Sequence, residues 1–144
     1  MLSKPRSGWS DLTLGDFRGS VSFLTDIPFD WLRACINGLK YVIPAAFFFD
    51  EEGSSGYIVS DLYATYVIIQ HNGTELTLVK GIGLKKFAEM LLHDIRENLE
   101  DWTWWCTFEL NDAQYAHRKA MLTELLEEAE QCLRTYLTGD IRNY

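Results

Sequence analysis

The 144-residue sequence has no basic cluster longer than Lys85-Lys86, and that absence restricts what the protein can bind. Its 13 lysines and arginines are outnumbered by 21 aspartates and glutamates, so the formal net charge is −8. Nucleic acids and anionic membrane surfaces attract basic faces, and the sequence predicts no such face. A basic protein partner is compatible with this charge, although an acidic surface also serves simply to keep a protein soluble.

Long apolar segments and cysteine motifs are missing as well. The longest apolar run, residues 42–49, contains Pro44 and is too short to span a bilayer. The first twelve residues lack the apolar stretch of a secretory signal. The three cysteines, Cys35, Cys106 and Cys132, are too few and too widely spaced for a disulfide framework or a zinc motif. We therefore expect a cytoplasmic protein whose cysteines pack in its interior.

Patterns typical of catalysis or metal binding are absent too. Among the three histidines, only His93 has acidic neighbours at helical spacing, Glu89 and Glu97, and a metal site normally needs three or more ligands. Cys106 lies thirteen residues after His93, which is about 20 Å along a straight helix and too far for a nucleophile and its base. The G-x-G at residues 81–83 is not followed by a phosphate-loop pattern. The sequence predicts no catalytic residue, no cofactor and no metal.

The most regular pattern in the chain covers residues 84–108, which we interpret as one long helix. Its apolar residues recur at three- and four-residue intervals: Leu84, Phe87, Ala88, Leu91, Ile95, Leu99 and Trp102. That spacing places them on one stripe, which predicts packing against a sheet. Trp105 continues the stripe, whereas Trp104 lies about 160° around the helix from Trp102. Either the helix ends there or Trp104 is exposed.

The remaining chain predicts strands and two further helices. Residues 1–11 are polar and predict a flexible tail, with a single domain over residues 12–144. Alternation in residues 17–23 predicts one strand, and a helix should start at Thr25 or Asp26 and end near residue 40. Residues 45–49 are apolar on both faces, which favours a central strand covered on both sides.

Two local signals are strong in the second half of the sequence. Asn72-Gly73 lies between strand-like segments and predicts a tight hairpin turn. Asn111 and Gln114 have capping-box spacing at the start of a last helix that should run to Gly139. The expected fold is α+β in the order β-α-β-β-β-β-α-α. A mixed or antiparallel sheet of four to five strands is packed by one N-terminal helix and two long antiparallel C-terminal helices.

Two groups of residues are candidates for binding a partner. The first is the acidic loop after the apolar strand, which also fits a plain solvated loop. The second is the aromatic cluster at the end of the long helix, because tryptophan is enriched among interface hot spots. The candidate set is Trp104, Trp105, Asp50, Glu51, Glu52 and Asp101.

In size, acidity and mixed topology the chain resembles small bacterial immunity proteins that neutralise toxins, although no motif assigns that role to a residue. We expect a non-enzymatic acidic protein-binding domain, in its sharpest version an immunity or inhibitor protein that blocks a basic partner. One alternative is an oligomeric structural or assembly domain, a homodimer paired through its last helix. Another is an enzyme or small-ligand binder with a pocket lined by Phe47, Phe49, Tyr57 and Trp102.

Overall fold

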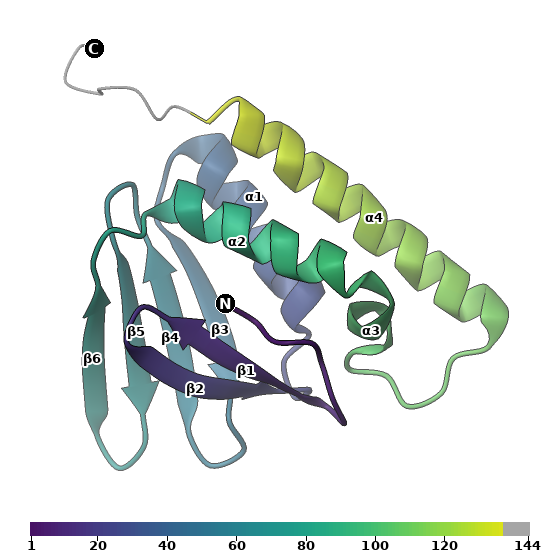
Figure 1. Ribbon diagram of the computed structural model, residues 1–144, viewed down its shortest axis with the longest axis horizontal. Coiled ribbons are helices and arrows are strands. Elements are labelled where there is room, and N and C mark those ends of the chain that lie inside the picture. Colours follow the sequence, from purple (N-terminus) through teal and green to yellow (C-terminus); the bar gives the residue numbers. More distant parts are fainter. Residues whose placement is uncertain (137–144) are drawn as a thin grey trace.

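The computed structural model describes residues 1–136 and has the element order β-β-α-β-β-β-β-α-α-α (Figure 1). Strands β1 (Trp9–Leu14) and β2 (Phe17–Ser22) form a hairpin. Strands β3 (Ala45–Asp50), β4 (Ser55–Ser60), β5 (Thr65–Gln70) and β6 (Thr74–Val79) form an antiparallel sheet in that order. The helices are α1 (Ile27–Tyr41), α2 (Leu84–Glu97), α3 (Leu99–Trp104) and α4 (Asp112–Arg134). The predicted α+β class is confirmed.

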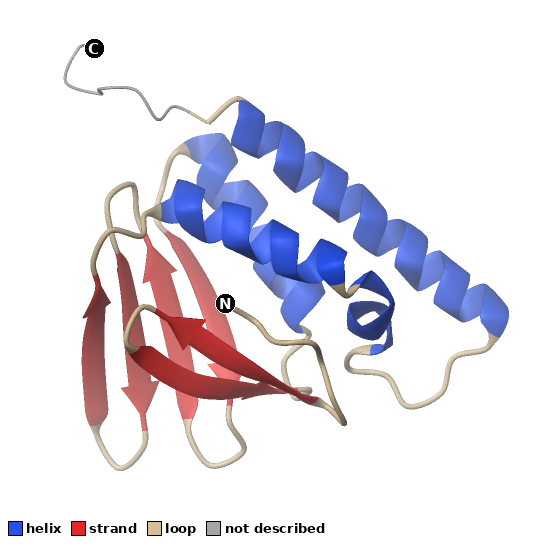
Figure 2. Ribbon diagram, in the orientation of Figure 1, coloured by secondary structure: helices blue, strands red, loops and turns tan. Residues whose placement is uncertain are grey.

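Helices and hairpin lie on one side of the four-stranded sheet (Figure 2). Each strand of this sheet turns alternate residues towards that side, where Phe47, Ile58 and Val67 are buried. The hairpin contributes Leu12 and Val21 to the same core. Helix α4 packs on α1, α2 and α3 and runs antiparallel to α2, as expected (Figure 1). None of the helices in residues 1–136 is long and apolar enough to cross a membrane.

An aromatic cluster joins α1, α2 and β3. Phe47 lies between Phe87 and Trp31, with ring centroids 4.4 Å and 5.7 Å away. Trp31 also approaches the ring of Phe49. Its indole Nε1 donates to the carbonyl oxygen of Phe48 at 2.7 Å, so the polar part of this buried side chain is satisfied. The cluster therefore fixes strand β3 to both helices.

The burial of Cys35 should make the free energy of unfolding depend on pH in the alkaline range. Burial raises the pKa of this thiol to about 12, and the neighbouring Cys132 adds to the shift. An unfolded thiol titrates near pH 8.5, so above that pH the unfolded chain loses a proton that the folded chain keeps. The free energy of unfolding should then fall by about 1.4 kcal/mol per pH unit between these two pKa values.

Urea unfolding of the wild type and Cys35→Ala on the alkaline side of pH 8.5 measures this effect. The variant starts from a lower stability because it leaves a cavity, but its stability should decline less steeply with pH. Parallel curves for the two proteins would show that the Cys35 thiol does not titrate in this way.

The N-terminal predictions need two corrections. Residues 1–11 are not a flexible tail, because Leu2 is buried and β1 begins at Trp9. The N-terminal ammonium lies 3.3 Å from the Asp94 carboxylate of α2, which fixes the chain end to that helix. The single strand predicted around residues 17–23 is the second half of a hairpin. Leu12 and Leu14 alternate with polar residues before a turn at Gly15, where φ is +54°.

The predicted helix over residues 84–108 is interrupted at Asn98, which has φ −127° and ψ 43°. Helix α2 ends at Glu97 and the short α3 ends at Trp104. A continuous helix would have carried more aromatic surface than one stripe can bury. The change of direction lets Trp102 and Trp105 both enter the core, with ring centroids 5.0 Å apart.

Two helix starts that looked alike in the sequence differ in the structure. At α4 the predicted capping box is confirmed, because Asn111 and Gln114 exchange side-chain bonds with each other's backbone N–H groups. At α1 neither predicted cap is formed. The N-cap residue is Asp26, but its side chain makes no capping bond and pairs with Arg118 instead.

Strand β3 is not the central strand that the sequence favoured. It lies at one edge of the four-stranded sheet, and only one of its faces is covered. Phe47 and Phe49 point into the core, whereas Phe48 is 40% exposed on the opposite face. The four residues expected to line one pocket do not share a side of the sheet, because Phe47 and Phe49 point towards the helices and Tyr57 points to the opposite face.

Candidate partner-binding site

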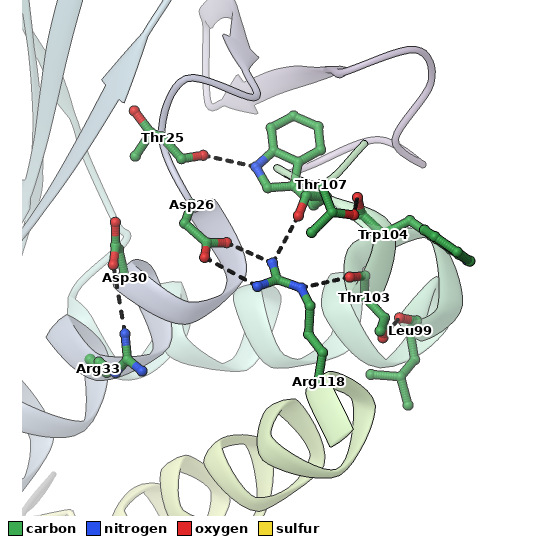
Figure 3. Close-up of polar contacts among 10 residues, drawn as sticks. Thr25, Asp26, Asp30, Arg33, Leu99, Thr103, Trp104, Thr107 and Arg118 are labelled. Carbon is green, nitrogen blue, oxygen red and sulfur yellow. Dashed lines mark hydrogen bonds and ion pairs between the residues drawn. The ribbon is translucent and has the colours of Figure 1, made fainter. Parts of the chain in front are cut away.

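Arg118 of α4 holds the turn after α3 against the start of α1 (Figure 3). Its Nε donates to the carbonyl oxygen of Thr103 at 2.7 Å, and its Nη2 donates to that of Trp105 at 2.8 Å. The guanidinium also pairs with the Asp26 carboxylate, with a shortest N–O distance of 3.0 Å. It stacks on the Phe29 ring, 4.5 Å from the centroid. These contacts fix the backbone on both sides of Trp104 and so set the direction in which its side chain points.

The two tryptophans predicted to bind a partner have different environments. Trp105 is buried, and its Nε1 donates to the carbonyl oxygen of Thr25 at 2.8 Å. It belongs mainly to the core and offers a partner little surface. Trp104 is 44% exposed and packs against Tyr115 of α4, with ring centroids 5.1 Å apart. Only Trp104 remains available to a partner.

A shallow cavity of about 370 Å³ lies beside Trp104. Trp105 and Phe108 supply part of its apolar lining, and Arg6 and Asp101 are its charged residues. Asp101 is half-buried, and its carboxylate is 3.9 Å from the Lys4 ammonium. The structure thus brings three of the six predicted residues together, from α3 and the turn that follows it.

The other three predicted residues lie where β3 ends, Asp50 as its last residue and Glu51 and Glu52 in the turn to β4, and none of them lines that cavity. Glu51 connects the two sheets, because its Oε1 accepts from the Ser20 backbone N–H at 3.2 Å. Its Oε2 accepts from the Ser54 hydroxyl at 2.8 Å. Asp50 accepts from the backbone N–H of Glu52 and stabilises the turn. Glu52 itself is exposed, so this acidic segment combines two structural carboxylates with an exposed one.

A broad apolar surface lies on the side of the four-stranded sheet that points away from the helices, which we call the outer face. Each of the four strands places three residues there, and the strand register arranges them in three rows. One row is Phe48, Tyr57, Ile68 and Leu76, and the next is Ala46, Val59, Tyr66 and Leu78. The third row, Asp50, Ser55, Gln70 and Thr74, is polar and borders the turns.

The two apolar rows cross the whole sheet without a polar interruption. Phe48, Tyr57, Leu76 and Leu78 are each at least 39% exposed, and the Phe48 and Tyr57 rings lie 5.2 Å apart. An antiparallel sheet with one solvated face normally alternates apolar and polar residues. Contiguous exposed apolar patches mark interaction surfaces. The outer face is therefore the part of the described structure best suited to a protein partner.

Sequence reasoning did not find this surface, although its signal was present. A strand with apolar residues on both faces, such as Phe47 and Phe48, fits two arrangements. Either both faces are covered by the protein itself, or one face is covered and the other binds a partner. Only the position of β3 at the sheet edge distinguishes the two cases. Arg118 was also missed, because its partners are distant in the sequence.

Within residues 1–136, no three histidine, cysteine or acidic side chains gather in a group that could hold a metal ion. His93, Glu89 and Glu97 are all exposed on α2. The chain matches no protein-family model, no curated protein and no solved structure. Its function is therefore inferred from the geometry of its own residues.

Proposed function

We propose that this chain is a non-enzymatic protein-binding domain and that its outer face binds a basic partner protein. The observation that supports this most directly is the pair of apolar rows across the outer face, which no described element covers. Covering such a surface removes apolar area from water, and each square ångström contributes about 25 cal/mol. A partner is the simplest source of that cover.

Charge favours a basic partner. The outer face carries one charged residue, Asp50, and the neighbouring turn adds Glu51 and Glu52. With a net charge of −8, the protein attracts cationic surfaces over a distance of about 8 Å at physiological salt. Complementary charge raises the rate of association and selects against acidic partners.

The sharpest form of the proposal is an immunity or inhibitor protein that neutralises a basic partner in the cytoplasm. An inhibitor of this kind needs a preformed binding surface and no chemistry of its own. The rigid sheet supplies such a surface, and the acidic turn at its border would pair with lysine or arginine. A homodimer through α4 remains a separate prediction, which light scattering would test.

A lysine at Tyr57 should weaken partner binding. The partner is first captured from a lysate with the wild-type chain, identified by mass spectrometry and purified. Calorimetry with the purified protein should then show affinity reduced at least about tenfold for Tyr57→Lys, because a cation replaces an apolar contact opposite a basic surface. Stability should change little, since Tyr57 is 39% exposed.

Met121 on α4 provides a matched control, because it is also 39% exposed and α4 packs mainly on α1, α2 and α3. Met121→Lys introduces the same charge and should leave the affinity unchanged. Trp104→Lys tests the cavity beside α3 in the same assay. An affinity that falls for Trp104→Lys but not for Tyr57→Lys would move the binding site to that cavity and reject the outer face.

A further inference from the structure

The two edges of the four-stranded sheet differ in how their backbone groups are used. The edge formed by β3 is occupied, because the Phe48 carbonyl oxygen accepts from the Trp31 indole and β2 packs beside it. The edge formed by β6 is open within residues 1–136, where β5 is its only hydrogen-bonded neighbour (Figure 1). Natural sheets usually block an open edge with charged side chains, proline or a bulge. Residues 74–79 contain no proline and no bulge, and Glu75 is their single charged residue.

The register shows which β6 groups point outwards. Beyond the last strand pair, the His71 N–H donates to the Gly73 carbonyl oxygen at 3.1 Å. Hydrogen-bonded pairs alternate in an antiparallel ladder, so Glu75, Thr77 and Val79 bond to β5. The N–H and C=O groups of Thr74, Leu76 and Leu78 therefore point away from the sheet. The same rule places the Phe48 carbonyl oxygen at the β3 edge, where Trp31 binds it.

The side chains of β6 define what an added strand must carry. Leu76 and Leu78 end the two apolar rows and are 63% and 47% exposed, so a strand beside them should present apolar residues on the outer face. Glu75 is the only charged residue within β6 and is exposed on the other face. A lysine or arginine opposite Glu75 would complete the match.

We propose that the partner adds an extended strand, with alternating apolar residues and a cation, to the open edge of β6. This inference rests on the proposed function and names the mode of binding. A second copy of the chain is a poorer occupant, because two copies would each bring a net charge of −8. Pairing two β6 strands would newly cover little beyond Leu76 and Leu78, whereas stable interfaces bury about 1,200 Å² or more.

A synthetic octapeptide tests the edge without the partner. The probe is acetyl-Thr-Val-Val-Thr-Val-Lys-Thr-Lys-amide, which places valines opposite Leu76 and Leu78 and a lysine opposite Glu75 when it pairs antiparallel. At millimolar peptide, amide hydrogen exchange at Leu76 and Leu78 should slow by about tenfold, because their N–H groups gain acceptors. Exchange at Thr77, already bonded to β5, should change less. Glu75→Lys should weaken the effect.

Two methylated peptides separate strand pairing from general adhesion. Methylating the backbone nitrogens of the third and fifth residues blocks the edge that faces β6, and methylating the second and fourth blocks the far edge. Only the first should abolish protection, and equal behaviour of the two peptides would overturn the proposal. No protection by the unmodified peptide would overturn it too. Protection that rises with protein concentration alone would assign the edge to a second copy.

The two proposals fail separately. If the peptide does not pair but Tyr57→Lys still weakens the partner, the outer face binds without an added strand. If the peptide pairs but Tyr57→Lys leaves the affinity unchanged, the proposed function of the outer face is rejected.

Discussion

Replacing Arg118 with alanine is expected to lower the free energy of unfolding by about 3 kcal/mol, measured by urea denaturation. The change leaves the carbonyl oxygens of Thr103 and Trp105 without their donor and the Asp26 carboxylate without its cation. It also removes the stacking on Phe29. Arg118 is 18% exposed and Asp26 31%, so water compensates for only part of these losses. This loss of stability should exceed the loss caused by removing any other ion pair within residues 1–136.

The neighbouring Lys119 is the control for charge alone. Its ammonium lies 3.4 Å from the Glu100 carboxylate at an exposed position, so Lys119→Ala should cost less than about 0.5 kcal/mol. Arg118→Lys keeps the charge but loses the planar fork, and its stability should fall between those of the two alanine variants. Equal losses for Arg118→Ala and Lys119→Ala would mean that the carbonyl contacts contribute nothing.

The features predicted correctly are those whose physical cause is local. The α4 capping box involves residues three apart, and the hairpin at Asn72-Gly73 depends on positive φ angles, +52° and +146° in the structure. The stripe of Leu84, Phe87 and Leu91 on α2 is buried as the helical period requires. In each case the residues that decide the structure lie within a few positions of one another.

The errors have a long-range cause. Asp26 looked like a helix cap, but its carboxylate is drawn away by Arg118, which lies 92 residues further along the chain. The chain departs from helical geometry at Asn98, and Trp102 and Trp105 pack together beyond that break, which spacing on one helix does not reveal. Trp105 is consequently a core residue that supplies only part of the lining of the cavity beside Trp104.

Alanine at Phe47 is expected to lower stability far more than alanine at Phe48, because these neighbours point to opposite sides of β3. Phe47 is 1% exposed and packs on Phe87 and Trp31. Phe47→Ala should lower the free energy of unfolding by about 3–5 kcal/mol, through lost burial and the cavity that remains. Phe48 touches Tyr57 on the outer face, and Phe48→Ala should cost less than about 1 kcal/mol.

Partner binding should reverse this order. Phe48→Ala removes part of the apolar row that we propose binds the partner, so calorimetry should show about tenfold weaker binding or more. Phe47→Ala, measured at a temperature where it is still folded, should bind nearly as well as the wild type, because its outer face is unchanged. A Phe48 variant that binds normally but unfolds as easily as the Phe47 variant would mean that the outer face serves stability. The exposed apolar rows would then need an explanation other than a partner.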